Sequence, residues 1–339
     1  MNAEELWVPW GYDMHIHLRM GEVLKAVVWF SANSFYGGLI MPNTDPKILT
    51  GADAVRYFNQ IRAICPGFKA GMTIYLTAQT TPKMILEAKE TGVVWAGKLF
   101  PAGVTTGSDE GVSDFQVLYP AFETMEKIGM ILSIHGQLPG KNIFFLDREE
   151  KFLPVLVQTA KDFPRLRIVI EHLSTKAAVQ TVLNLGDNVA ATITIQHMVL
   201  TANDFADGAL RPDNFCIPPP QRLEDRDALR RAAMSGNPKF FCANDSAPHV
   251  SPKLKGGVFS APVAKQALVQ LFERHAQERM LAGFMAEFGP RFYGLPKGRE
   301  QEMRKMVRRD WTVPASYPCG NDVIVPFMAG ETLHWQVAD

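Results

Sequence analysis

Eight short apolar runs recur along the 339-residue chain, and each is followed by a longer stretch of helical periodicity. The runs are rich in Val, Ile, Thr and aromatic residues, as strands buried on both faces of a parallel sheet require. They lie at residues 12–18, 36–41, 70–76, 93–100, 130–135, 167–172, 189–197 and 239–244. The helical stretches span residues 21–32, 52–64, 82–91, 119–128, 149–162, 176–185, 225–234 and 261–274.

This alternation predicts an α/β fold, a (β/α)8 TIM barrel formed by one domain over residues 1–339. A doubly wound open sheet is the alternative, but it usually carries a glycine-rich turn after its first strand. Here the first predicted strand contains His15-Ile16-His17 instead. We expect residues 294–339 to form a C-terminal extension packed on the barrel. Loops 101–115 and 199–222 are unusually long, which is typical of functional loops.

Charge and composition narrow the classes of partner. Lys plus Arg number 35 and Asp plus Glu number 35, so no overall field attracts nucleic acid or an anionic membrane. No apolar run reaches the ~18–20 residues of a membrane span, and the N-terminus does not resemble a signal peptide. Four scattered cysteines without a CxxC pair are typical of free thiols. We therefore expect a cytoplasmic protein without nucleic-acid or membrane partners.

Chemically active side chains occur where the predicted strands end. His15 and His17 alternate along the first strand, so both should face the barrel interior. Four further side chains end later strands: Lys98, His135, His172 and Asp245. A barrel brings such ends into one mouth, and imidazole and carboxylate groups are good zinc ligands. Lysine can join them only as a carbamate formed with carbon dioxide, an anion with two oxygens. The constellation predicts a binuclear metal site.

Six motifs occur in order: DMHIHLR from Asp13, MPN from Met41, GKLFPA from Gly97, EHLSTK from Glu171, DSAPH from Asp245 and FYGLP from Phe292. On these motifs the chain resembles the amidohydrolase superfamily and, within it, the shorter single-function type of dihydroorotase. The HxH pair marks only the superfamily, whereas HxHLR, MPN and DSAPH in this order are much more specific. The resemblance runs from Asp13 to about Trp335, nearly the whole chain.

The resemblance implies reversible cyclisation of N-carbamoyl-L-aspartate to L-dihydroorotate, a step of pyrimidine synthesis, by a homodimer with two zinc ions per subunit. It implies that one zinc is held by His15, His17, Asp245 and a carboxylated Lys98. The same Lys98 would bridge to the second zinc, which His135 and His172 also hold. Asp245 would be the catalytic residue that moves a proton between water and the ring nitrogen.

The resemblance also implies how the substrate is held. Its carboxylate would be gripped by Arg19, Asn43 and His249, and the planar fork of an arginine suits a carboxylate. The ring amide would contact backbone groups of Ile217 and Ala261. A mobile loop would close over the substrate through Thr105 and Thr106.

The chain departs from the family pattern at three places. Gln137 stands where an acid is expected, and Asn244 stands where threonine is more familiar. Segment 250–260 is short beside relatives that carry a cysteine-rich insertion there. None of these departures removes a predicted metal ligand.

Two other functions remain open, as does the role of His197. A cyclic amidase such as a hydantoinase or imidase would use the same metals but would need no carboxylate clamp. An inactive barrel could serve as a scaffold, although such relatives commonly lose ligands and this chain retains all six. His197 ends the predicted seventh strand, where a contact behind or at the edge of the site and plain packing are both open.

Overall fold

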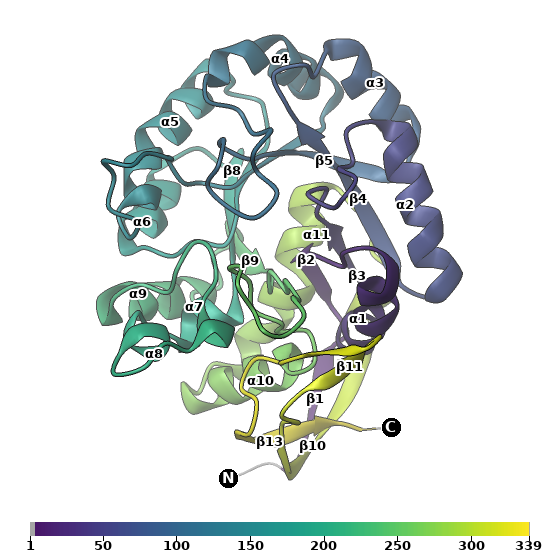
Figure 1. Ribbon diagram of the computed structural model, residues 1–339, viewed down its shortest axis with the longest axis vertical. Helices are drawn as coiled ribbons and strands as arrows, with labels where there is room; N and C mark the ends of the chain where they lie inside the picture. The colour runs from purple at the N-terminus through teal and green to yellow at the C-terminus, as the bar shows by residue number, and fades with distance from the viewer. Residues whose placement is uncertain (1–3, 339) are drawn as a thin grey trace.

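Eight parallel strands, hydrogen-bonded to one another in sequence order, form a nearly closed barrel in the computed structural model (Figure 1). The structure describes residues 4–338, so residues 1–3 and 339, the ends of the predicted domain, lie outside it. The barrel strands are β2 (Tyr12–Ile16), β3 (Gly37–Ile40), β4 (Lys69–Leu76), β5 (Val94–Leu99), β6 (Ile131–Ile134), β7 (Ile168–Ile170), β8 (Val189–Ile193) and β9 (Phe240–Cys242). The predicted (β/α)8 barrel is confirmed.

Helices surround the strands, as Figure 1 shows. The main ones are α1 (Gly21–Ser34), α2 (Gly51–Ile64), α3 (Pro82–Glu90), α4 (Tyr119–Ile128), α5 (Arg148–Asp162), α6 (Lys176–Asn184), α9 (Leu223–Ala233) and α10 (Ala264–Arg274). Shorter helices are α7 (Ile195–Val199), α8 (Asn203–Ala206), α11 (Phe288–Tyr293) and a π-helical turn at Gly283–Glu287. Thr50, Thr81 and Thr175 cap α2, α3 and α6 by accepting backbone N–H groups. None of the helices over residues 4–338 is long and apolar enough to cross a membrane.

The core has two layers because successive strand residues face opposite sides. Leu39 and Met41 belong to the cluster inside the barrel, whereas Ile40 between them packs in the layer between strands and helices. Met14, Ile131 and other buried apolar side chains fill the interior. Each fully buried side chain of this size stabilises the fold by about 1.5–3 kcal/mol, so the pattern fixes which face of each strand points inward.

An irregularity in β2 directs the HxH pair. The register of β2 against β3 shifts between Asp13 and Ile16. Met14 faces the barrel interior, but Ile16 packs in the outer layer, although regular alternation would put both on one face. His15 and His17 flank Ile16 and therefore face inward at the mouth. Such bulges often re-aim side chains beside active sites.

Contacts between β2 and the chain after β9 close the barrel. The backbone N–H of His17 donates to the carbonyl of Ser246 at 3.0 Å. Asn244 donates to the Asp13 carboxylate from its backbone nitrogen at 2.8 Å and from Nδ2 at 3.1 Å. The asparagine that departs from the family pattern therefore uses its amide to join the first and last barrel strands.

The C-terminal extension pairs with the N-terminus beside the barrel. Strands β1 (Glu5–Pro9), β10 (Met303–Thr312) and β13 (Thr332–Val337) form an antiparallel sheet, and β11 (Tyr317–Cys319) pairs with β12 (Asp322–Ile324). Strand β13 packs against α10, and both described chain ends lie at this sheet (Figure 1). The predicted extension is confirmed, but β1 was not predicted. A five-residue strand carries little periodicity of its own and is defined by pairing with β10, about 300 residues away.

The predicted seventh strand, residues 189–197, is too long. β8 ends at Ile193, and Thr194 caps α7 by accepting the backbone N–H of His197 at 3.2 Å. The placement of His197 at a strand end is therefore wrong. The sequence from Thr194 to His197 is compatible both with the end of a strand and with a capped helix. The hydrogen bond from the His197 N–H to Thr194 distinguishes the two structures.

Candidate active site

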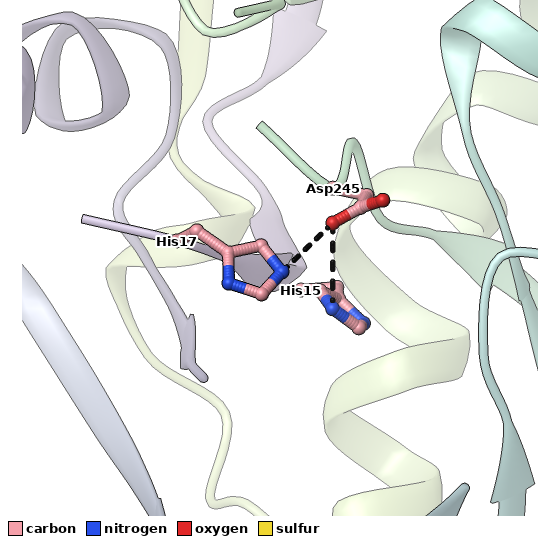
Figure 2. Close-up of side chains that lie close together, drawn as sticks. All are labelled: His15, His17 and Asp245. Carbon is pink, nitrogen blue, oxygen red and sulfur yellow. Dashed lines mark ion pairs between the residues drawn. The ribbon is translucent and has the colours of Figure 1, made fainter. Parts of the chain in front are cut away.

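Two elements meet at the mouth of the barrel and bring three potential metal ligands together. His15 and His17 come from the end of β2, and Asp245 comes from the turn after β9 (Figure 2). One ligand atom from each residue lies within 4.8 Å of the other two. Asp245 Oδ1 is 3.0 Å from His17 Nε2 and 3.5 Å from His15 Nε2. This is a candidate metal site buried at the base of a cavity.

The other predicted metal-site residues lie beside these three. The ring centroids of His15 and His172 are 5.0 Å apart, and those of His172 and His135 are 4.7 Å apart. Lys98 lies on β5 opposite Ser133 of β6, the strand that leads to His135. The side chain of Lys98 is fully buried, and its Nζ is 5.1 Å from the centroid of the Phe100 ring. The barrel thus gathers all six at one mouth, as predicted.

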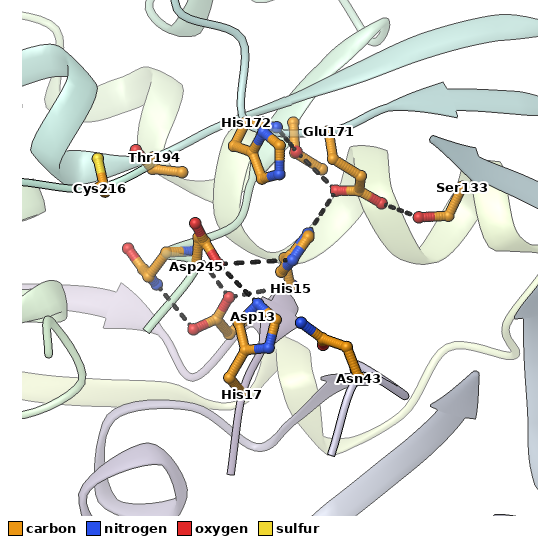
Figure 3. A network of polar contacts seen from close by, with 12 residues as sticks. Asp13, His15, His17, Asn43, Ser133, Glu171, His172, Thr194, Cys216 and Asp245 are labelled. Atoms are coloured by element: carbon orange, nitrogen blue, oxygen red, sulfur yellow. Dashed lines mark hydrogen bonds and ion pairs between the residues drawn. The ribbon is translucent and has the colours of Figure 1, made fainter. Parts of the chain in front are cut away.

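Buried acceptors orient two of the imidazoles. Glu171 accepts from His15 Nδ1 at 3.0 Å, from Ser133 Oγ at 2.5 Å and from the Thr192 hydroxyl at 2.7 Å (Figure 3). Since a carboxylate only accepts, His15 carries its proton on Nδ1 and turns the Nε2 lone pair toward Asp245. Glu171 was not predicted as a site residue, although its place next to His172 in the EHLSTK motif was a signal.

Gln137 does for His135 what Glu171 does for His15. Its Oε1 accepts from His135 Nε2 at 2.8 Å, which leaves the lone pair on Nδ1 of that ring. The glutamine at this position is therefore a neutral replacement for the expected acid. It preserves the acceptor and the orientation of the ring, although it does not supply negative charge.

Electrostatics favours the metal-binding form of the histidines. Burial lowers the pKa of His17 to about 4 and that of His135 to about 3, and it lowers the pKa of His172 well below the usual value. These rings are neutral near pH 7, the form that binds metals. Burial alone would raise the pKa of Asp245, but His15 and His17 outweigh it and lower the pKa to about 2. The carboxylate is therefore ionised.

Several buried polar atoms have no hydrogen-bond partner within residues 4–338. They include His15 Nε2, His172 Nδ1 and Lys98 Nζ. An unpaired buried polar atom costs about 1–3 kcal/mol, so their concentration in one place indicates that the site is built for a ligand. Imidazole nitrogens beside a carboxylate are the donors that zinc prefers. The residues present therefore fit a metal.

Backbone strain also concentrates here. Arg19, His172 and Asp245 have φ values of 58°, 42° and 44°, in the left-handed region that ordinary residues avoid. Each such residue costs about 1–3 kcal/mol, and such residues cluster at functional sites. The Tyr57 hydroxyl donates to the carbonyl of Arg19 and stabilises its unusual conformation.

Most predicted substrate-binding residues share the cavity with the histidines. Arg19, Asn43, Thr105, Thr106 and Ile217 line it. Its free volume is about 20 Å³, and an adjoining cavity of about 600 Å³ is also lined by Arg19, Asn43 and Thr106. His249 lies in the wall of the larger cavity, where its Nε2 is 3.1 Å from Arg19 Nη2. The same Nε2 is 3.3 Å from the Gly256 carbonyl, so His249 lies between the Arg19 guanidinium and the glycines of the cavity wall.

Ala261 differs from the other predicted substrate-binding residues in its contacts. Its N–H donates to Ser246 Oγ at 3.1 Å, and its carbonyl accepts from Ser34 Oγ at 3.0 Å. Both backbone groups are hydrogen-bonded in this structure, and the contact of Ala261 with the ring amide remains a prediction. Ala261 is not among the residues that line the cavity. Gly256 and Gly257 line it instead.

A candidate metal site beside a charged cavity at the C-terminal mouth of a (β/α)8 barrel fits the class of metal-dependent amidohydrolases. Comparison with known proteins narrows the class. A curated dihydroorotase from Shewanella loihica is 41% identical over 334 residues, covering 96% of this chain and 97% of that protein. No protein-family model matches the chain.

Solved structures agree with the curated relative. The Campylobacter jejuni dihydroorotase has a TM-score of 0.92 at 36% identity, covering 100% of this chain and 98% of that one. The Saccharomyces cerevisiae dihydroorotase, solved with 5-fluoroorotic acid, has a TM-score of 0.92 at 33% identity and 99% coverage of both chains. The chain belongs to the dihydroorotase family of cyclic amide hydrolases.

Proposed function

We propose that this chain interconverts L-dihydroorotate and N-carbamoyl-L-aspartate with two zinc ions per subunit. The observation that carries the proposal is one cavity in which Arg19 and Asn43 lie beside His15, His17 and Asp245. A substrate with both a carboxylate and a cyclic amide uses both halves of this cavity. A hydantoin has no carboxylate, so a hydantoinase would have no use for the guanidinium.

We assign one zinc to His15, His17, Asp245 and Lys98, and the other to Lys98, His135 and His172. The metals, when bound, would polarise an amide carbonyl and lower the pKa of water. Burial lowers the pKa of Lys98 to about 8, so part of the population carries a neutral amine near pH 7. That amine adds carbon dioxide and releases a proton. The resulting carbamate has two oxygens and would satisfy a lysine that otherwise lacks a partner within residues 4–338.

Asp245 is the proposed proton carrier. Its carboxylate is ionised and lies at the base of the cavity, as a general base for water requires. In hydrolysis the oxygen of water bonds to the amide carbon, and Asp245 takes the proton that water loses. It then delivers that proton to the ring nitrogen as the carbon–nitrogen bond breaks. Cyclisation runs the same transfers in reverse.

The loop that carries Thr105 and Thr106 is the proposed cover of the site. Asn43 Nδ2 donates to the Thr106 carbonyl at 3.0 Å, and both residues line both cavities. Lys47 Nζ holds the same loop through Glu110 at 2.8 Å and Asp109 at 3.3 Å. Since the inner cavity has room for little more than a water molecule, the loop must move to admit a substrate.

We propose that the chain forms a single domain, assembles as a homodimer and acts in the cytoplasm. The four cysteines are buried and unpaired, which fits a reducing compartment. The dimer rests on the resemblance to the family.

The decisive experiment measures turnover of dihydroorotate and hydantoin by the zinc-loaded protein and by Asp245→Asn. We expect turnover of dihydroorotate alone, and its near-complete loss in Asp245→Asn with ligand affinity retained. Preference for hydantoin would instead make the protein a related cyclic amidase. Inactivity on both substrates with full zinc content would make it a scaffold.

A further inference from the structure

A short segment, Phe215 to Pro218, contributes to the wall of the cavity. It lies outside the helices and strands, and its Ile217 lines the cavity. A binding group on such a loop needs external support to hold its position to about 0.5 Å. Side chains from two separate parts of the chain provide that support, one at each end of the segment.

Lys253 anchors the first end. Its Nζ donates to the Phe215 carbonyl at 3.0 Å and also to the Gly257 carbonyl. The N–H of Gly257 donates to the same Phe215 carbonyl at 3.0 Å. Lys253 thus joins two loops that are some forty residues apart in the chain and that both line the cavity, one through Ile217 and the other through Gly256.

His197 anchors the second end. The Thr194 hydroxyl accepts the His197 backbone N–H at 3.2 Å and can then donate to His197 Nδ1, 2.7 Å away. The ring proton is therefore on Nε2, which donates to the Pro218 carbonyl at 3.0 Å. This network fixes both the tautomer and the orientation of a ring that is 1% exposed.

Neither anchoring residue lines the cavity, so both can act on a ligand only through the residues they hold. We propose that Lys253 and His197 are positioning residues, which set the backbone of Ile217 and Gly256 at the distance that a substrate ring amide requires. The inference rests on the proposed function, because it assigns this wall to the ring of dihydroorotate.

Burial of Lys253 supports a dedicated role. Burial lowers the pKa of its ammonium to about 8, because a charge removed from water must be compensated by its neighbours. Two backbone carbonyls compensate it here. An apolar side chain could fill the same space without the cost of burying a charge, so the presence of a lysine here indicates a specific role.

The first test compares Lys253→Met with a matched control, Lys239→Met. Lys239 Nζ also donates to backbone carbonyls, those of Val182, Leu185 and Gly186, but at the opposite end of the barrel, before β9. Both substitutions remove a lysine that holds backbone carbonyls together. We expect Lys253→Met to raise KM for dihydroorotate about tenfold or more, with kcat and zinc content nearly unchanged. Lys239→Met should lower Tm and leave KM unchanged.

The second test uses His197→Gln and His197→Phe. The glutamine amide can still donate to Pro218, whereas phenylalanine fills similar space without a donor. We expect His197→Phe to raise KM as Lys253→Met does, and His197→Gln to restore most of the affinity. If Lys253→Met does not fold, the comparison of His197→Gln with His197→Phe still tests the positioning role.

The outcomes separate the two hypotheses. A wild-type protein that does not turn over dihydroorotate contradicts the proposed function, and the inference falls with it. An active wild type in which Lys253→Met and Lys239→Met share one KM overturns the positioning role alone. Equal KM values for His197→Gln and His197→Phe, or loss of zinc in Lys253→Met, would do the same.

Discussion

At the scale of single residues, the site is defined by polar atoms that lack partners. Lys98 is the clearest example, since its side chain is fully buried and its Nζ has no hydrogen-bond acceptor within residues 4–338. Its Nζ lies over the face of the Phe100 ring, a contact that compensates a buried charge weakly. A lysine in these surroundings is expected to be chemically altered or paired with a ligand.

Lys98→Ala tests the carbamate. We expect the protein to lose one zinc equivalent and at least about a hundredfold in kcat, because the bridging oxygens disappear. Short carboxylic acids should restore part of the activity by replacing the bridge. The measurement is metal analysis together with turnover, and full activity at normal zinc content would contradict the assignment.

Arg19→Lys tests the carboxylate clamp. Lysine retains the charge but cannot form the bidentate bond, whose contribution is about 1.5–3 kcal/mol, so kcat/KM for dihydroorotate should fall about 10–100-fold. Zinc content should be unchanged, because Arg19 belongs to the substrate side of the cavity. Loss of zinc in Arg19→Lys would show that Arg19 supports the metal site and not only substrate binding.

At the scale of elements, short or irregular pieces of chain carry the site. The loop of residues 101–112 lines the cavity through Thr105 and Thr106 and is held by its own contacts, in which Thr105 and Ser108 hydrogen-bond to each other through backbone and hydroxyl groups. Three glycines, at 103, 107 and 111, interrupt it, and Gly103 and Gly107 have positive φ. Such a loop can open without disturbing the barrel beneath it.

The double substitution Thr105→Val and Thr106→Val tests closure. Removing both hydroxyls should lower kcat about tenfold or more while Tm and zinc content stay the same, because the loop lies outside the barrel core. Thr124→Val on α4, far from the cavity, is the matched control and should be neutral. Unchanged kinetics in the double variant would reduce the loop to a simple connection.

Lys265 on α10 predicts a pH dependence of stability. It donates to the carbonyls of Pro9 and Trp10 and so ties the end of β1 to the barrel. Burial, with added repulsion from Arg304, lowers its pKa from 10.5 to about 7. Between about pH 7 and 10 the unfolded chain therefore binds more protons than the folded one, so stability rises with pH across this window.

Chemical denaturation of wild type and Lys265→Met at pH 7, 8.5 and 10 checks the sign. The wild-type free energy of unfolding should increase relative to that of Lys265→Met as pH rises. Parallel curves would mean that Lys265 retains an ordinary pKa in the fold.

At the scale of the whole molecule, the barrel and the added sheet have different tasks. The barrel brings six candidate ligands from five strand ends to one mouth, and the sheet of β1, β10 and β13 covers α10 beside it. Trp335 of β13 is 1% exposed and donates from Nε1 to Glu273 at 2.9 Å, so the extension is joined to the barrel by buried contacts.

The proposed homodimer is testable by sedimentation equilibrium across a range of concentrations. We expect a mass of twice the 37.7 kDa chain at micromolar concentration, with dissociation only on dilution. A single-chain mass throughout the range would contradict the dimer without affecting the proposed reaction.

Much of the site was predictable because its signal is local. An apolar run that ends in a histidine, lysine or aspartate indicates both a buried strand and the region where that strand ends, and His135, His172 and Lys98 lie at or just beyond such ends. The order of strands and helices followed from periodicity alone for the same reason. The barrel and the direction of its strands therefore followed from local sequence patterns, as did the choice of six candidate side chains at its mouth.

Only the tertiary structure decided how those side chains are held. His15 is oriented by Glu171, 156 residues away, and Asp13 is joined to Asn244 across 231 residues. Neither separation leaves a periodic trace in the sequence. The same holds for His197, whose role depends on a carbonyl in a loop twenty-one residues later. Hydrogen bonds between distant segments depend on where the closed barrel brings them, and a linear pattern contains no information on that distance.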